Sequence, residues 1–133
     1  MKILLDTHYL IWSLTDTKKI SKKIQSIILR DENDIFVRTL SLWEISLKYS
    51  INKLEFKNIT IDDFLPAIKK SGFNILPFDE EQAISFYKLP KLKNKDPFDR
   101  MIIWQSIKND IYLLSADKKL INECRALNLK IMA

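Results

Sequence analysis

The 133 residues are enough for one globular domain, and 47% of them are apolar, which can furnish a substantial core. No apolar run approaches the roughly 18 residues needed to span a bilayer, and the opening MKILLDT has no signal-peptide cleavage site, so we expect a cytoplasmic protein without a membrane partner, a single domain over residues 1–133. The net charge of +5 suits a polyanionic partner, while the single glycine, Gly72, excludes a dinucleotide fingerprint and a P-loop, which both need several glycines.

The first half of the chain alternates short strands with helices. Apolar runs predict strands at 1–5 and 35–37. Between them, isoleucines recur at helical spacing over 20–28 behind Ser21, a suitable N-cap, and predict an amphipathic helix. Further on, apolar residues at helical spacing predict a helix over 41–49, and another opens at Thr60-Ile-Asp-Asp63 and ends before Gly72, a C-cap glycine.

The second half continues the alternation. In chain order, the pattern predicts a strand at 73–76, a helix at 79–87, a basic connector LPKLKNKDP, a helix at 97–109 with Pro97 in its first position, a strand at 112–114, a helix at 118–126 and a strand at 130–132. Alternating β and α elements with right-handed connections favour a parallel sheet covered on both faces. The predicted fold class is therefore α/β, a three-layer α/β/α sandwich with a central parallel sheet.

Four acidic residues stand where a predicted strand ends or a predicted helix begins: Asp6, Glu44, Asp99 and Asp117. Strand C-termini and helix N-termini open onto the same edge of a parallel sheet, which is where ligands bind. Carboxylates gathered there repel one another unless a cation lies between them. Because oxygen-rich sites suit Mg²⁺ or Mn²⁺, the pattern indicates a divalent metal site.

Each acidic residue also has a purely structural interpretation. Asp6 could bond its own backbone in a turn, and Ser41-x-x-Glu44 matches a capping box. Asp99, in the first turn after the Asp96-Pro97 helix start, would favour the helix dipole, and Asp117 could cap the helix that follows it. Only their expected position on one edge favours the functional interpretation.

Other chemically notable residues are predicted to be structural. His8, the only histidine, has no histidine or cysteine partner for a zinc site. The lone Cys124 cannot form an internal disulfide and lies on an apolar helix face, which predicts a core position. The three tryptophans fall in helical apolar patterns and are predicted to anchor the core: Trp12, Trp43 and Trp104.

Four segments, in this order and spacing, resemble a known family: LLDTHYLIWSL, SLWEISLKYSINKLEF, ILPFDEEQAISFYKLPKLKNKDPFDRMIIWQS and YLLSADKKL. They are similar to PIN-domain ribonucleases, in particular to the VapC-like toxins of bacterial toxin–antitoxin pairs. The resemblance implies a PIN-like three-layer fold, metal-dependent cleavage of single-stranded or loop RNA, a cognate antitoxin and a homodimer. Residue by residue, it implies that Asp6, Glu44, Asp99 and Asp117 form the acidic, catalytic Mg²⁺ (or Mn²⁺) site, with the hydroxyls of Thr7 and Ser115 beside it.

The chain departs from these relatives at two places. Those with a DPFDR segment often carry His-Arg before it, where this chain has Asn94-Lys95, and Arg38 stands where relatives commonly have a small residue. We expect the large Arg38 side chain to alter substrate access. Because all four carboxylates are retained, we expect an active enzyme.

The expected reaction is hydrolysis of RNA phosphodiester bonds by an endoribonuclease. Four basic residues flank the acidic positions and are candidate phosphate ligands: Lys95, Arg100, Lys118 and Lys119. An antitoxin segment carrying Arg or Lys could inhibit the enzyme by pairing with the carboxylates. Two alternatives stay open: a non-catalytic RNA- or protein-binding PIN domain whose acidic residues are caps, and an Asp-based phosphatase or receiver domain. The latter needs a second acidic residue next to Asp6, and Thr7-His8-Tyr9 supplies none.

Overall fold

The computed structural model describes all 133 residues and is built on one parallel sheet of five strands in the order β3-β2-β1-β4-β5. The strands are β1 (Lys2–Leu5), β2 (Asp34–Arg38), β3 (Asn74–Leu76), β4 (Tyr112–Leu114) and β5 (Ile131–Met132). The helices are α1 (Thr7–Thr15), α2 (Lys22–Leu29), α3 (Thr39–Ser50), α4 (Phe64–Lys70), α5 (Glu80–Ser85), α6 (Pro97–Asn109) and α7 (Lys118–Ala126). Short 3₁₀ turns lie at Thr17–Lys19, Ile61–Asp63 and Phe86–Lys88. In the central strand β1, Ile3 pairs with Ile35 on one side and Tyr112 on the other.

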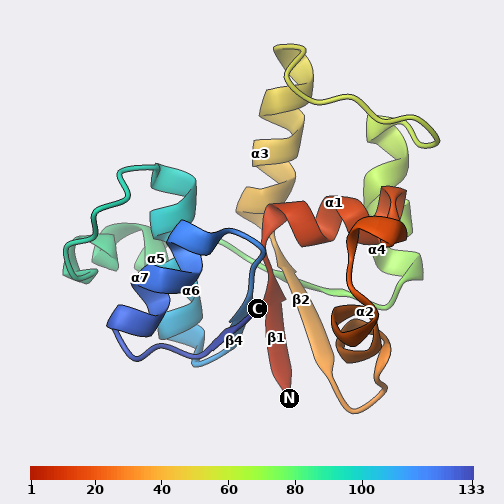
Figure 1. Cartoon of the computed structure of the whole chain (residues 1–133). Helices are drawn as coiled ribbons and strands as arrows, with labels where there is room; N and C mark the ends of the chain where they lie inside the picture. The colour runs from red at the N-terminus through yellow and green to blue at the C-terminus, as the bar shows by residue number, and fades with distance from the viewer.

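Helices cover both faces of the sheet. Figure 1 shows α1, α2 and α4 on one side of the strands and α5, α6 and α7 on the other, while α3 extends beyond the edge at which the strands end. This arrangement confirms the predicted three-layer α/β/α sandwich with a central parallel sheet.

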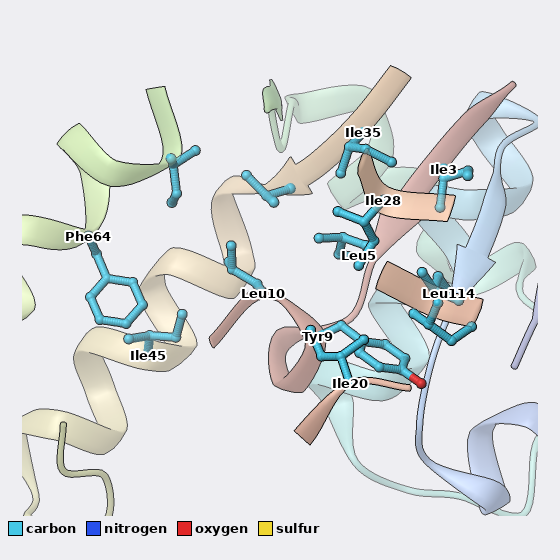
Figure 2. Close-up of a cluster of buried hydrophobic side chains, with 13 residues drawn as sticks. Ile3, Leu5, Tyr9, Leu10, Ile20, Ile28, Ile35, Ile45, Phe64 and Leu114 are labelled. Carbon is cyan, nitrogen blue, oxygen red and sulfur yellow. The ribbon is translucent and has the colours of Figure 1, made fainter. Parts of the chain in front are cut away.

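Side-chain alternation along the central strands divides the core into two clusters. Ile3, Leu5 and Leu114 belong to a cluster of 13 buried residues beneath α1, α2 and α4, drawn in Figure 2. Leu4 and Leu113 point the other way, into a cluster of 11 under α5, α6 and α7. Because both faces are buried, β4 and the last three residues of β1 are apolar rather than alternating.

Local capping signals place most helix ends where the sequence predicts them. Ser21 and Asp96 cap α2 and α6, and a Thr60–Asp63 capping box opens the 3₁₀ turn before α4. Gly72, just past α4, has a φ of +77°, which an L side chain rarely adopts. The helix α1 was not delimited by the sequence pattern, because it begins directly after β1 with only Asp6 between them.

The tryptophan prediction is wrong for one of the three. Trp104 is buried and its indole Nε1 donates to Ser85 Oγ (3.2 Å), and Trp12 packs, partly buried, against the first cluster. Trp43 on α3 is 57% exposed, and its ring lies on the surface beside that of Phe98 in α6, with ring centroids 5.4 Å apart. Cys124 is fully buried, as predicted. None of the helices combines the length and apolar character needed to cross a membrane.

Candidate active site

A small cavity of about 40 Å³ lies beyond the ends of β1, β2 and β4. Its walls are formed by residues from these strand ends and from helices α1, α3, α6 and α7: Asp6, Thr7, His8, Arg38, Glu44, Asp99, Ile102, Asp117 and Leu120. The structure therefore brings the four predicted carboxylates, from four separate segments, around one space.

Asp6 follows β1 and is held by three donors. It is the N-cap of α1, and its Oδ1 accepts from the Tyr9 backbone N–H (2.9 Å). Its Oδ2 accepts from Ser115 Oγ (2.5 Å) and from the Ala116 N–H (3.2 Å), both in the loop after β4. Burial nevertheless raises the pKa of Asp6, against the lowering effect of these hydrogen bonds, because a desolvated carboxylate is costly.

Glu44 is not the capping-box residue that the sequence suggested as an alternative. Helix α3 begins earlier, at Thr39, so Ser41 and Glu44 both lie inside it. Glu44 Oε1 accepts from Thr7 Oγ1 (2.8 Å), and Oε2 accepts from Lys48 Nζ one turn further along (2.7 Å). Helix α3 thus aims this carboxylate back toward the start of α1.

Asp99 and Asp117 enter the cavity from helix starts. Asp96 supplies the cap of α6, so Asp99 in the first turn is free to face the cavity, where its Oδ2 accepts from Asn94 Nδ2 (2.8 Å). Burial raises the pKa of Asp99, the Asn94 bond opposes the rise, and neighbouring carboxylates, including Asp117, add to it. Asp117 does cap α7, with Oδ1 accepting from the Lys119 N–H (2.9 Å), while its own N–H donates to Ser115 Oγ (3.0 Å).

Arg38, the last residue of β2, is enclosed in the wall of the cavity rather than standing at its mouth. The residue is 1% exposed, its Nε donates to Ser41 Oγ (3.0 Å), and its Nη2 lies 3.9 Å from Glu44 Oε1. Its Nη1 is buried without a hydrogen-bond partner. Burial lowers the pKa of Arg38 to about 10, with Glu44 and Asp99 opposing the shift, so the side chain is charged at neutral pH.

The cavity is lined by carboxylate oxygens, which are the ligands that a hard divalent ion prefers. In this structure, however, the carboxylates are not arranged around a single ion. As they stand, no three acidic, histidine or cysteine side chains are arranged to hold a metal ion. Each carboxylate is instead bonded by protein donors. Four carboxylates around one cavity, two of them with raised pKa values, nevertheless fit Mg²⁺ or Mn²⁺, which would relieve their repulsion.

The four predicted phosphate ligands do not lie together. Lys95 and Lys119 share a polar groove with Lys93, Asn94, Asn122 and Glu123, next to Asp99 through the Asn94 bond. Lys118 lines a different pocket, beside Arg125. The Arg100 guanidinium packs over the Phe86 ring at 5.0 Å. Sequence reasoning missed Lys93, which lies two residues before Lys95 in the same basic connector.

The fold, the four-carboxylate cavity and the sequence lead to the same class of protein. The family profile of the PIN domain matches residues 3–124. The chain therefore belongs to the PIN-domain family, whose members are usually Mg²⁺-dependent ribonucleases.

Solved structures from bacteria and archaea share this fold. A chain of VapBC2 from Rickettsia felis, crystallised bound to a DNA fragment from its promoter, has a TM-score of 0.66 at 15% identity, with 99% of this chain and 98% of that one covered. A domain of a functionally unknown protein from Methanocaldococcus jannaschii gives 0.59 at 15% identity, covering 98% and 89%. A PilT N-terminus domain protein from Sulfolobus solfataricus gives 0.53 at 16% identity, covering 99% and 86%. No curated protein sequence matches.

Proposed function

We propose that the protein is a metal-dependent endoribonuclease that hydrolyses RNA phosphodiester bonds, and that it is the toxin of a toxin–antitoxin pair. The observation that carries the proposal is the convergence of Asp6, Glu44, Asp99 and Asp117 on one cavity of a PIN domain. Purely structural caps would not need to share a cavity, since each helix start is satisfied locally.

Asp6, Asp99 and Asp117 are the residues we propose to hold Mg²⁺ or Mn²⁺. When bound, such an ion supplies an activated water at neutral pH and neutralises charge at the phosphorus. The protein contributes position. Ser115 fixes Asp6 through a 2.5 Å hydrogen bond, and Asn94 fixes Asp99 at 2.8 Å. Asn94, at one of the two positions where relatives often have His-Arg, thus holds Asp99 in place.

The groove beside Asp99 is the proposed path of the RNA backbone. Lys93, Lys95 and Lys119 line it, and lysines that contact phosphates position a strand without reading its sequence. Of the other predicted phosphate ligands, Lys118 could extend this path only from a separate pocket, while Arg100 is engaged with Phe86.

The proposed protein partners are an antitoxin and a second copy of the chain. The similarity to a chain of VapBC2 supports an antitoxin. For the homodimer, α3 offers exposed apolar side chains beyond the sheet at Trp43 and Leu47, with Ile51 just after the helix.

Cleavage of a structured RNA pool with Mg²⁺, with Mn²⁺ and with excess chelator tests the activity. We expect cleavage only with a divalent ion, and none from Asp99→Asn. The matched control is Asp62→Asn, an exposed aspartate outside the cavity, which should cleave like the wild type. Cleavage in chelator would refute the metal mechanism. An RNA-binding protein that never cleaves and gains no thermal stability from Mn²⁺ would instead be the non-catalytic PIN domain.

A further inference from the structure

The cavity already contains one fixed positive charge, that of Arg38. The side chain is 1% exposed and its Nη1 has no hydrogen-bond partner, although four carboxylates line the same cavity. A buried, partly unpaired guanidinium is costly unless nearby negative charge compensates it. Its closest carboxylate is Glu44, with Nη2 and Oε1 3.9 Å apart.

Glu44 differs from the other three carboxylates in forming ion pairs of its own. Besides Arg38, Lys48 Nζ lies 2.7 Å from its Oε2, and Thr7 donates to its Oε1. Asp6, Asp99 and Asp117 are bonded only by neutral donors. The cavity is thus divided: Glu44 forms two ion pairs with the protein, whereas the three aspartates form none and feel the charge of Arg38 only at longer range.

We propose that Arg38 takes the place of a second cation in this cavity, so that the protein binds a single divalent ion, on the side of Asp6, Asp99 and Asp117, and Glu44 is a partner of Arg38 rather than a metal ligand. This inference rests on the metal-dependent function proposed above. A fixed guanidinium in the wall of the same cavity would repel a second ion, because charges interact strongly where water is excluded.

The guanidinium is enclosed, which argues against a direct role in holding RNA. Its Nε donates to Ser41 Oγ at 3.0 Å, and Ser41 is itself fully buried, with its Oγ 3.2 Å from Thr7 Oγ1, which accepts its proton. A phosphate in the groove of Lys93, Lys95 and Lys119 would meet those exposed lysines instead.

Titration of the metal-free protein with Mn²⁺ by calorimetry, with electron paramagnetic resonance to count bound ions, tests the proposal. The wild type should bind one ion per chain. Arg38→Gln removes the charge but retains a donor for Ser41, and it should bind a second ion or bind the first at least about tenfold more tightly. Arg38→Lys keeps the charge and should behave like the wild type.

Two further variants test the role of Glu44 and of its two cationic neighbours. The double variant Arg38→Gln/Glu44→Gln removes one charge of each sign, leaves no unpaired buried ion, and should retain one ion with affinity within about tenfold of the wild type. Lys48→Gln changes the other, 43% exposed neighbour of Glu44, and should not alter the number of ions.

The outcomes separate this inference from the proposed function. Two ions on the wild type, or an Arg38→Gln protein that binds one ion with unchanged affinity, would overturn the role of Arg38 and leave the ribonuclease proposal standing. A tenfold or larger loss of affinity in the double variant would make Glu44 a ligand and also overturn it. No Mn²⁺ binding by any variant would refute both proposals.

Discussion

Arg38 and Glu44 face each other in the wall of the cavity at 3.9 Å, with side chains only 2% and 11% exposed. Neither charge can reach bulk water easily if the other is removed. The interaction between Arg38 and Glu44 therefore affects the free energy of unfolding as well as the net charge of the proposed metal site.

We expect Glu44→Gln to lower the free energy of unfolding by about 3 kcal/mol, because it leaves Arg38 as an unpaired buried charge. The double variant Arg38→Gln/Glu44→Gln should lose less than the sum of the two single variants, since both charges disappear together. Urea unfolding of the four proteins measures this coupling. Lys48→Gln is the exposed-pair control and should change stability by less than about 1 kcal/mol. Additive losses would mean that the two side chains do not interact.

We expect Asp99→Asn to stabilise the protein at pH 7 in chelator, because burial and neighbouring carboxylates raise the pKa of Asp99 above its ordinary 3.8. The folded state holds this proton at pH values where the unfolded chain has lost it, so wild-type stability falls as pH rises from about 3.8 through the raised pKa. Since the side chain is half-buried, solvent screening should keep the gain below about 1 kcal/mol.

The effect of Asp99→Asn on the free energy of unfolding should also depend on pH and on Mn²⁺. The stability gain should shrink as pH falls toward 3.8, where the wild-type side chain also becomes neutral. Excess Mn²⁺ should reverse the order at pH 7, because only the wild type keeps the proposed ligand. Denaturant curves at pH 7, 5 and 4 check both statements. An Asp99→Asn protein less stable than the wild type in chelator at pH 7 would show that Asp99 serves the helix start.

We expect Ser115→Ala to destabilise the protein by about 1–2 kcal/mol, because it removes the donor to Asp6 and the acceptor of the Asp117 N–H. Losing a hydrogen bond to the charged form raises the pKa of Asp6 further, so the acid limb of the pH–rate profile should move to higher pH. Ser50→Ala, an exposed serine on α3, is the control. If the acid limb of Ser115→Ala lay at the same pH as that of the wild type, Asp6 would not be the group whose protonation limits the reaction.

We expect Lys95→Gln/Lys119→Gln to weaken RNA binding without changing the fold. Each lysine that neutralises a phosphate of a single strand contributes roughly 0.7 to the slope of log affinity against log salt, so the slope should fall by roughly 1.4. Binding is measured with the Asp99→Asn background in increasing KCl. Lys22→Gln/Lys23→Gln, at the start of α2 on the opposite face of the sheet (Figure 1), should keep the wild-type slope.

The fold followed from the sequence because its signals are local. Apolar runs marked β1 and β4, and caps such as Ser21 and Asp96 marked helix starts, since each needs only neighbours within one turn. The positions of the four carboxylates followed too, because parallel topology sends every strand end to one edge. Less could be expected for α3, where the Ser41-x-x-Glu44 pattern suggested a helix start two residues later than Thr39.

What the sequence by itself determined is the alternation of strands and helices, the family, and which acidic side chains stand at one edge of the sheet. Only the tertiary structure decided that Arg38 lies buried among them, that Glu44 bonds Thr7 from 37 residues away, and that Ser115 bonds Asp6 across 109. It also decided that Trp43, on α3, is exposed. The reason is physical: the charge and burial of a side chain depend on neighbours brought by other segments, and no local pattern records which segments those are.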